Sequence, residues 1–266
     1  MENRLPISVC LISGAESARI GNALASVVDW TSEIVVVLNE DVADGTDSIA
    51  ARYGAKVFRE PWKGHIAQKN SAVQKATQDW VLGLDTDEVV SPELQAEIAR
   101  VFACRSDLER FAGFSFPRLT FFCGRWIRHG DWYPDRGTRL WRRGLAEWGG
   151  VNPHDKLLVS GKVRSLQGRL LHFNAASIND QIAKISAYSD DFLANTLERR
   201  QRVTRMDLAM RPGWRFVRGY FLRGGFLDGW QGYYIAWMTA FYTATRYARV
   251  KEMQMRTEKL SPSNPL

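Results

Sequence analysis

Short apolar runs alternate with helical patterns up to about residue 110, and this alternation limits the folds open to the chain. Four runs have the length and composition of buried strands, and they lie at residues 7–12, 34–38, 56–58 and 81–84. The segments between them repeat apolar residues every three or four positions, as helices do. Because strands that alternate with helices build a mainly parallel sheet covered on both faces, we expect an α/β domain.

Three acidic residues follow the fourth run, where the strand is expected to end: Asp85, Asp87 and Glu88. Open α/β sheets bind ligands at the carboxyl ends of their strands. Carboxylate oxygens are also the ligands that Mg²⁺ and Mn²⁺ prefer, often together with substrate phosphates. The alternative is that these acids cap the next helix. Ser91 already supplies a helix N-cap, which favours the cation over the cap.

The pattern of apolar and polar residues changes after about residue 110. Short strand patterns continue to about residue 171, and helical periodicity returns over residues 177–201. We therefore expect one α/β domain over residues 1–175 and a helical appendage over residues 176–266.

The basic residues are concentrated in this appendage. The chain has a net charge of +7, and residues 198–256 alone carry 12 Lys and Arg against 4 Asp and Glu. Residues 212–247 contain 12 of the 31 aromatic residues. Arginine, tryptophan and tyrosine favour an anionic membrane surface, so we expect this region to lie on a membrane. A helix packed on the core is the alternative, and nucleic-acid binding is a rival that no motif supports.

The sequence lacks the patterns of exported and membrane-spanning proteins. It has no run of about 18 uninterrupted apolar residues, and its N-terminal residues lack the regions of a signal peptide. Its three cysteines fit neither a zinc site nor a disulfide framework. We therefore expect a cytoplasmic protein.

Taken in order, these pieces resemble the family 2 glycosyltransferases of GT-A fold, and among them the bacterial lipopolysaccharide-core β-glucosyltransferases. The segments that carry the resemblance are 7–13, 33–37, 44–46, 68–70, 84–88, 124–134, 139–142, 154–156 and 171–172. The most specific is the run Gly-Arg-Trp-Ile-Arg-His-Gly-Asp-Trp-Tyr-Pro at 124–134, whose bases and aromatic rings suit an acceptor-binding loop.

The resemblance implies an inverting transferase. Such an enzyme moves a sugar, here glucose from UDP-glucose, onto a lipopolysaccharide-core or other surface-glycan acceptor. It uses Mg²⁺ or Mn²⁺ and works at the cytoplasmic face of the inner membrane. Its partners are then a nucleotide-sugar donor, a glycolipid or surface-glycan acceptor and an anionic membrane surface, and not a nucleic acid.

The resemblance also assigns roles to single residues. Asp155 takes the place of the base that removes the acceptor proton, with Asp131 in reserve, although an Asp in a polar turn can instead cap its own backbone. Asp85, Asp87 and His172 are the candidate metal ligands, and a structural hydrogen bond explains His172 equally well. The residues expected to bind the donor are Ser13, Glu16, Asn39, Glu40, Gln68, Lys69, Asn70, Asp85 and Arg139. For Lys69 and Arg139, a solvated surface charge is the alternative.

Two positions depart from the family pattern. Ala15 stands where the family has Asn, and the second strand ends in Leu38-Asn39-Glu40 where the family has the Asp that binds the base. Asn39 or Glu40 can replace that Asp as a hydrogen-bond acceptor. The departures leave the nucleotide open, and they make a non-catalytic, membrane-associated nucleotide-sugar or glycan-binding homologue the alternative function.

Overall fold

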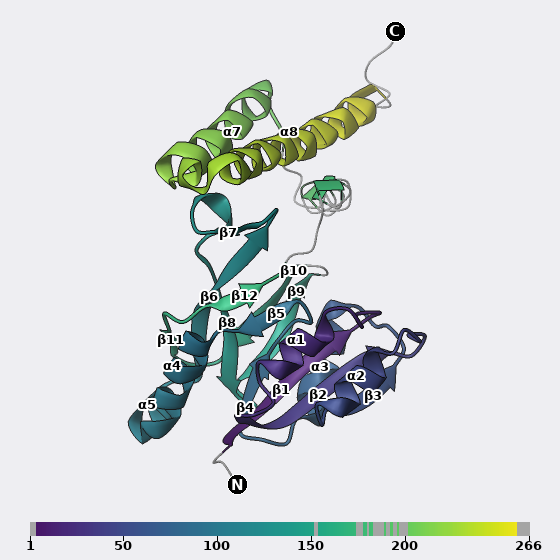
Figure 1. Ribbon diagram of the computed structural model, residues 1–266. Helices are drawn as coiled ribbons and strands as arrows, with labels where there is room; N and C mark the ends of the chain where they lie inside the picture. The colour runs from purple at the N-terminus through teal and green to yellow at the C-terminus, as the bar shows by residue number, and fades with distance from the viewer. Residues whose placement is uncertain are drawn as a thin grey trace. The chain divides into compact units, whose positions relative to one another are not determined.

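The structure, a computed structural model, describes residues 4–151, 154–173 and 202–259, with a few separate positions between 178 and 196 (Figure 1). Residue contacts divide the chain into two compact units. The first contains residues 1–119 and 135–173, and the second contains residues 120–134 and 174–266. The division after residue 173 lies beside the expected boundary near 175, whereas residues 120–134 join the second unit. The helix expected over 177–201 lies for the most part outside the described residues.

The first unit begins with the expected alternation of strands and helices. In chain order its elements are β1 (Leu5–Ser13), α1 (Ile20–Ala25), β2 (Thr31–Asn39), α2 (Thr46–Arg52), β3 (Lys56–Glu60), α3 (His65–Lys75), β4 (Trp80–Gly83), β5 (Glu88–Val90), α4 (Pro92–Ala103) and α5 (Arg105–Arg110). The remaining strands are β6 (Gly113–Phe122), β8 (Asp135–Arg142), β9 (Ala146–Val151), β10 (His154–Val159), β11 (Val163–Ser165) and β12 (Leu170–His172). All four predicted strands are present, and the short strand β5 is an addition that the sequence pattern does not predict.

These strands form a mixed sheet in the order β3-β2-β1-β4-β8-β6-β12-β5, with β11 beside β6. The strands β3, β2, β1 and β4 run parallel. The strand β8 then joins both β4 and β6 in antiparallel pairing. The expected parallel sheet is therefore present in the alternating part of the chain, and the later strands make the whole sheet mixed. The strands β9 and β10 pair with each other as a separate antiparallel hairpin.

Helices cover both faces of this sheet, because its central strand is apolar on both sides. On β1, Ile7 and Leu11 pack with α1, α2 and α4 in one core, and Cys10 packs with α3 in the other. Side chains of a strand alternate between the two faces of a sheet, so a strand covered on both sides reads as a continuous apolar run. The polar residues that follow such a strand stand at the sheet edge, where solvent and ligands reach them.

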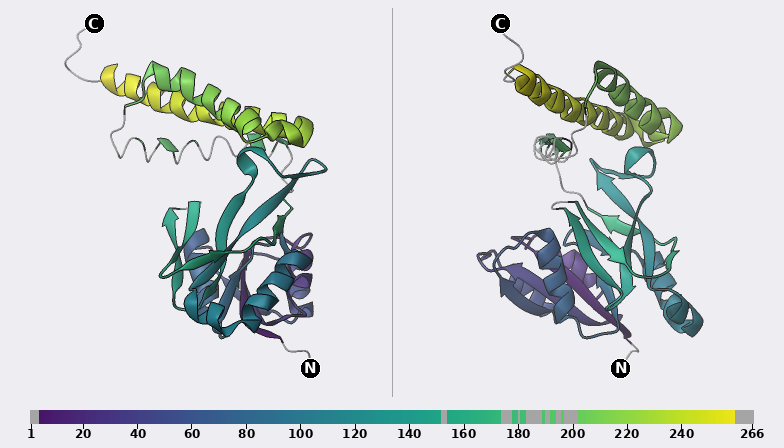
Figure 2. Two further views of the ribbon diagram at one scale, coloured as in Figure 1. Left: turned by 90° about the vertical axis from the view of Figure 1, so that its left-hand side faces the viewer. Right: turned by 180° about the vertical axis from the view of Figure 1, so that it is seen from behind.

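The second unit combines a short hairpin with helices. Its described elements are the end of β6, then β7 (Arg125–Ile127), the 3₁₀ turn η1 (Gly130–Trp132), α7 (Arg205–Val217), the π-helical turn η2 (Arg218–Leu222), the 3₁₀ turn η3 (Gly225–Asp228) and α8 (Gly229–Lys259). Phe122 and Ile127 of the hairpin pack against Ile235 of α8. Both views of Figure 2 show α7 and α8 side by side. Among the described residues, no helix is both long enough and apolar enough to cross a membrane.

Candidate active site

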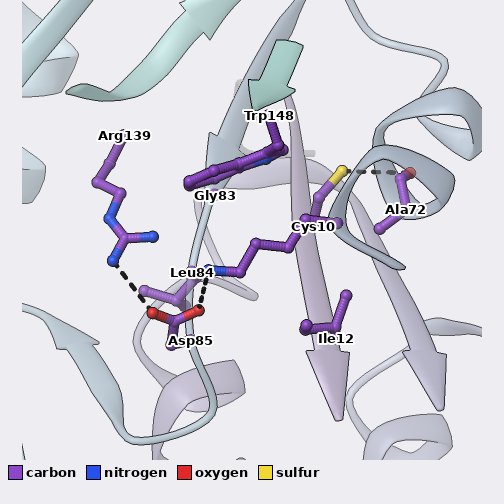
Figure 3. A pocket seen from close by; sticks show the side chains of 9 residues that line it. Cys10, Ile12, Ala72, Gly83, Leu84, Asp85, Arg139 and Trp148 are labelled. Carbon is purple, nitrogen blue, oxygen red and sulfur yellow. Dashed lines mark hydrogen bonds and ion pairs between the residues drawn. The ribbon is translucent and has the colours of Figure 1, made fainter. Parts of the chain in front are cut away.

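The carboxyl end of β4 carries a carboxylate held between two cations. Asp85 follows this strand, and its Oδ1 lies 3.1 Å from Nζ of Lys69 on α3. Its Oδ2 accepts a 3.0 Å hydrogen bond from the guanidinium of Arg139 on β8 (Figure 3). Both cations are largely buried, with side-chain exposures of 12% for Lys69 and 15% for Arg139. The alternative that they are solvated surface charges is therefore wrong.

The charges of this group reinforce one another. Burial disfavours the charged form of Asp85, but the neighbouring charges of Arg139 and Lys69 outweigh it and hold the pKa of Asp85 well below its ordinary value. Burial likewise opposes the charge of Arg139, and the carboxylates of Glu88 and Asp85 outweigh it, so the pKa of Arg139 is raised. Asp85 is therefore an anion, and Arg139 a cation, at every physiological pH.

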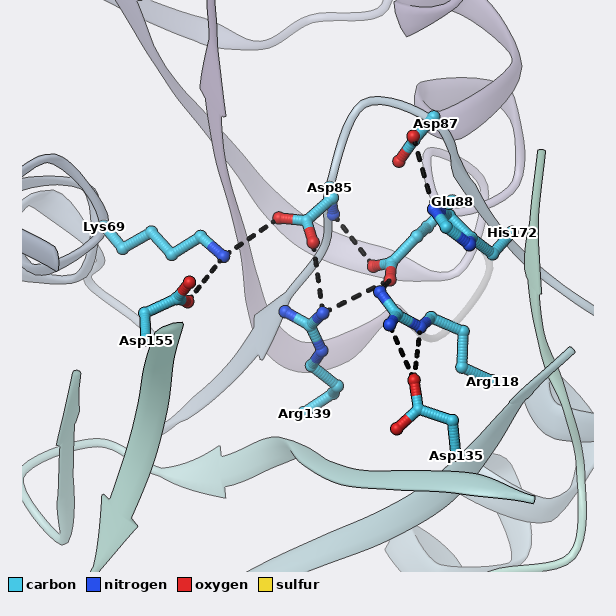
Figure 4. Close-up of polar contacts among 9 residues, drawn as sticks. All are labelled: Lys69, Asp85, Asp87, Glu88, Arg118, Asp135, Arg139, Asp155 and His172. Carbon is cyan, nitrogen blue, oxygen red and sulfur yellow. Dashed lines mark hydrogen bonds and ion pairs between the residues drawn. The ribbon is translucent and has the colours of Figure 1, made fainter. Parts of the chain in front are cut away.

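A second set of charged residues supports Asp85 and Arg139. Glu88 is fully buried, and it accepts hydrogen bonds from the Asp85 backbone N–H at 3.0 Å and from Arg139 at 3.2 Å (Figure 4). Arg118 of β6 lies 3.5 Å from Glu88 and donates two hydrogen bonds to Asp135 at the start of β8. Glu88 thus fixes the backbone of Asp85 and the direction of Arg139. Its buried carboxylate is part of the support of the site.

Lys69 joins Asp85 to the candidate base. Its Nζ donates a 2.9 Å hydrogen bond to Asp155 and lies 4.5 Å from the ring centroid of Trp148. The side chains around Asp85 pack closely, and the cavity that they line has a volume of about 10 Å³.

The hairpin of β9 and β10 places Asp155 beside Lys69. Asp155 is the second residue of β10, opposite Gly150 of β9, so the alternative of a turn Asp that caps its own backbone is wrong. The hairpin is fixed to α3 by Asn70, whose side chain donates to the carbonyl of Trp148 at 2.8 Å and accepts from its N–H at 2.9 Å. The amide of Asn70 is thereby used within the protein, and its donor-binding role stays a prediction.

Asp87 and His172 form a separate pair. The strand β12 runs antiparallel to β5 with His172 opposite Glu88, and the N–H of Phe173 donates to the carbonyl of Asp87 at 2.8 Å. This register brings Nε2 of His172 to 3.3 Å from Oδ2 of Asp87. A carboxylate and an imidazole side by side fit a divalent cation whose other ligands are phosphate oxygens and water.

The three predicted metal ligands do not come together as one set. Asp85 is engaged by Lys69 and Arg139, while Asp87 and His172 face each other (Figure 4). Among the described residues, no group of three or more His, Cys, Asp and Glu side chains gathers where it can hold a metal ion. The donor set that fits a cation is therefore the pair Asp87 and His172, and a bound ion needs further oxygens from a ligand.

The ends of β1 and β2 lie at the same sheet edge as Asp85, because β2, β1 and β4 are parallel neighbours. The Ser13 hydroxyl donates to the carbonyl of Gly14 at 2.9 Å. Asn39 ends β2, and its side-chain oxygen is buried without a hydrogen-bond partner in the described structure. A buried acceptor without a partner is costly, and a ligand donor at this position would satisfy it. The donor-binding roles of Ser13 and Asn39 stay predictions.

The remaining predicted donor residues differ in their surroundings. Glu16 pairs with Arg19 at 2.8 Å. Glu40 is exposed, and its backbone N–H donates to the carbonyl of Glu60 at 2.9 Å. Gln68 is fully buried, and both polar atoms of its amide lack a partner among the described residues. The donor-binding roles of Glu16, Glu40 and Gln68 stay predictions.

The reserve base Asp131 belongs to the second unit. Its carboxylate lies 3.2 Å from Arg223 and 3.8 Å from Arg215. The neighbouring residues of the 124–134 run are bound in the same unit, since the backbone N–H groups of Arg128 and His129 both donate to the buried carboxylate of Asp228. The run therefore has a structural role in the second unit, and its role in acceptor binding stays a prediction.

Sequence reasoning missed Arg118 and Asp135. They pair because Arg118 stands opposite Asp135 in the antiparallel register of β6 and β8. The available signal was Arg118, a charged residue inside the apolar pattern of β6. Its partner Asp135 follows only from the register between β6 and β8.

Comparisons with known proteins bear on both fold and function. Residues 8–107 match the family described as Glycosyl transferase family 2. An uncharacterized glycosyltransferase of Rickettsia prowazekii is 29% identical, covering 97% of this chain and 91% of the relative. A protein of Rhizobium meliloti named lipopolysaccharide core biosynthesis glycosyltransferase LpsC is 27% identical, covering 92% of this chain and 94% of the relative.

Among solved structures, the mannosyltransferase PcManGT from Pyrobaculum calidifontis, in complex with GDP-Man and Mn²⁺, has a TM-score of 0.56. The match covers 95% of this chain and 88% of that chain at 13% identity. At this identity the likeness speaks for the fold alone, and it confirms the GT-A fold expected from the sequence.

Proposed function

Because the chain carries a family 2 glycosyltransferase domain, we propose that it is an inverting hexosyltransferase that uses a nucleotide sugar, with UDP-glucose as the first donor to test. The observation that carries the proposal is the junction at the end of β4, where Lys69 contacts both Asp85 and Asp155. Lys69 therefore brings together the cations that can bind a diphosphate and the carboxylate, Asp155, that can accept a hydroxyl proton.

The proposed reaction is a single displacement. The acceptor oxygen forms a bond to the anomeric carbon of the sugar while the bond from that carbon to the diphosphate oxygen breaks. The diphosphate leaves with the electron pair, and Asp155 accepts the proton of the acceptor hydroxyl. Arg139 and Lys69 exchange their carboxylate partners for diphosphate oxygens, since guanidinium and ammonium groups bind phosphate well. The cations then offset the charge that develops on the leaving group.

The cofactor we propose is Mg²⁺ or Mn²⁺, held by Asp87 and His172. A divalent cation in this place would act as a Lewis acid toward the diphosphate. The pairing of a carboxylate with an imidazole supports this assignment, and so does the Mn²⁺ named for the mannosyltransferase of the same fold.

For the acceptor we propose a lipopolysaccharide-core or other surface glycan carried by a lipid, which the enzyme meets at the cytoplasmic face of the inner membrane. The support is the relative named for lipopolysaccharide core biosynthesis, together with the basic and aromatic character of residues 198–256.

Donor binding and turnover test the proposal directly. Thermal unfolding is measured with UDP-, GDP- and ADP-sugars, each with and without Mn²⁺, because a ligand at a hundred times its Kd stabilises by about 2.7 kcal/mol. We expect one nucleotide class to raise the Tm in the presence of the cation. The purified protein should also release the nucleoside diphosphate slowly in the absence of acceptor.

The departures at Ala15 and Leu38 favour one alternative, a binding protein that kept the fold without activity. A nucleotide sugar that raises the Tm without any release of nucleoside diphosphate, with or without acceptor, would identify the protein as that binding homologue. No stabilisation by any nucleotide sugar would contradict both functions.

A prediction for Lys69 follows from its two carboxylate partners. In Lys69→Met, Asp85 and Asp155 lose the cation that they share, and the donor diphosphate loses one of its two proposed cations, so donor affinity should fall. Breaking a largely buried pair typically costs about 3–5 kcal/mol, so the Tm should fall as well. Calorimetry with the donor and thermal unfolding measure both effects.

Two further variants make this prediction specific. Lys69→Arg keeps the charge and should restore most of the donor affinity. Lys75→Met makes the same change on α3 at a lysine that pairs with Glu60, and it should leave the donor affinity unchanged. Unchanged donor affinity in Lys69→Met would contradict the role of Lys69 in donor binding.

A further inference from the structure

We propose that α7 and α8 dock on an anionic membrane surface through their exposed apolar stripes, which are rich in aromatic side chains and are here together called the aromatic face. On α7 this face consists of Met206, Met210, Trp214 and Val217, whose exposures run from 41% to 70%. Their spacing of four, four and three residues places them on one side of the helix. They form an apolar stripe that the described structure leaves open to solvent.

The helix α8 carries a matching stripe. Trp230, Tyr233, Trp237 and Phe241 are between 48% and 56% exposed, and their spacing of three, four and four residues again defines one side of a helix. The opposite side of α8 is buried through Ile235 and Thr243. The helix is therefore amphipathic in an unusual sense, because its solvent-facing side is the more aromatic one.

Ring contacts link α7 and η2 to the stripe of α8. Phe216 of α7 lies 5.2 Å from Trp237 and 6.1 Å from Tyr233, and Tyr220 of η2 lies 5.6 Å from Tyr233, all between ring centroids. Tyr233 and Trp237 belong to the exposed stripe of α8, so Phe216 and Tyr220 add aromatic rings beside that stripe. Exposed apolar surface of this kind marks an interaction site.

The charge around the aromatic face identifies the partner. Residues 205–256 contain nine Lys and Arg against three Asp and Glu. Asp131 of the same unit adds a fourth acid, which lies beside Arg215 and Arg223, and Asp207 and Glu252 pair with Arg211 and Arg256. The nine basic residues still outnumber these four acids by five. Helices that combine a basic excess with exposed tryptophan and tyrosine match the negative headgroups and the interfacial zone of a bilayer.

The same charge argues against a second copy of the chain as the occupant. Two copies that met through this face would bring like charges together, which opposes association. An anionic bilayer instead gains from each arginine. The reason for docking rests on the proposed function, because a lipid-linked acceptor lies in that bilayer, but docking itself can be measured without donor or acceptor.

The test uses the full-length protein and phosphatidylcholine vesicles with and without phosphatidylglycerol, over a salt series. The test variant combines Trp214→Ser with Trp237→Ser, and the control is Trp62→Ser, a 50% exposed tryptophan of the first unit. We expect wild type to co-sediment with the anionic vesicles and to bind less, but still measurably, as salt rises. The double variant should bind at least about tenfold more weakly, because it loses buried aromatic area, while the control should bind as wild type does.

A second readout locates the contact. Brominated acyl chains should quench the tryptophan fluorescence of wild type and of Trp62→Ser, and should quench the double variant less. Equal vesicle binding by wild type and the double variant, or no binding by wild type, would overturn the proposal. So would a wild-type dimer in sedimentation equilibrium that the double variant disperses, since the face would then join two copies.

Nucleotide-sugar stabilisation measured on the same samples separates this inference from the proposed function. Stabilisation without vesicle binding refutes docking alone. Vesicle binding without stabilisation by any nucleotide sugar refutes the proposed transferase and leaves docking in place.

Discussion

Asp155→Asn is expected to bind the donor as wild type does and to lose transfer. Asparagine keeps the shape of aspartate and can still accept the hydrogen bond that Lys69 donates to Asp155, but it cannot take a proton from the acceptor. Loss of a general base typically costs a factor of about 10²–10⁴ in rate, and the loss should fall on kcat. Calorimetry with the donor and steady-state kinetics with donor and acceptor measure the two quantities separately.

The matched control for this variant is Asp107→Asn, which makes the same change at a carboxylate that pairs with Arg164 on the first unit. It should keep both donor affinity and kcat. If Asp155→Asn transfers sugar within a few-fold of wild type, Asp155 is not the base, and Asp131→Asn is the next variant to measure.

Asp87→Ala is expected to abolish the part of donor binding that depends on the cation. Asp87 and His172 are held side by side by the pairing of β5 with β12, so removing the carboxylate leaves the imidazole as the one protein ligand of the pair. Changes at metal sites typically cost a factor of about 10–100 in metal affinity or activity even outside the direct ligands, and a direct ligand should cost at least as much. Titration of Mn²⁺ with the nucleotide sugar into wild type and variant measures the loss.

Two comparisons make this result specific. His172→Ala should weaken Mn²⁺-dependent binding in the same direction, and Asp107→Ala should leave it unchanged. In the presence of a chelator, wild type and Asp87→Ala should bind the donor equally, because the cation no longer contributes. Unchanged Mn²⁺-dependent affinity in Asp87→Ala would remove the metal role of that residue.

The local sequence pattern was sufficient to predict the part of the fold that carries the proposed donor site. The alternation of strands and helices gives β1 to β4, and the abrupt change from apolar to acidic residues marks the strand end where Asp85 lies. Ser91 caps α4 as expected, accepting a hydrogen bond from the N–H of Leu94. Each of these features depends on residues close together in the sequence, which is why a reading along the chain finds them.

The rest depends on registers between distant strands. His172 meets Asp87 because β12 pairs with β5, and Arg118 meets Asp135 because β6 pairs with β8. A one-residue slip in either pairing would send these side chains to the opposite face of the sheet, and no local pattern fixes that choice. The strand β5 has three residues, too few for any periodicity to reveal. The roles of Lys69, Arg139 and Asp155 came from the resemblance to a known family, and their mutual contacts came from the structure.

The hairpin of β9 and β10 pairs with itself, and it is linked to α3 through the amide of Asn70 and the ion pair of Lys69 with Asp155. If Asp155 is the base, donor recognition and acceptor activation are encoded in separate stretches of the chain. Descendants of such an enzyme can then lengthen or reshape the hairpin, and so admit a different acceptor, while the sheet that holds the donor is inherited unchanged. In that case, exchanging this hairpin between relatives, with Asn70 retained, should change the acceptor that the enzyme uses and leave its donor unchanged.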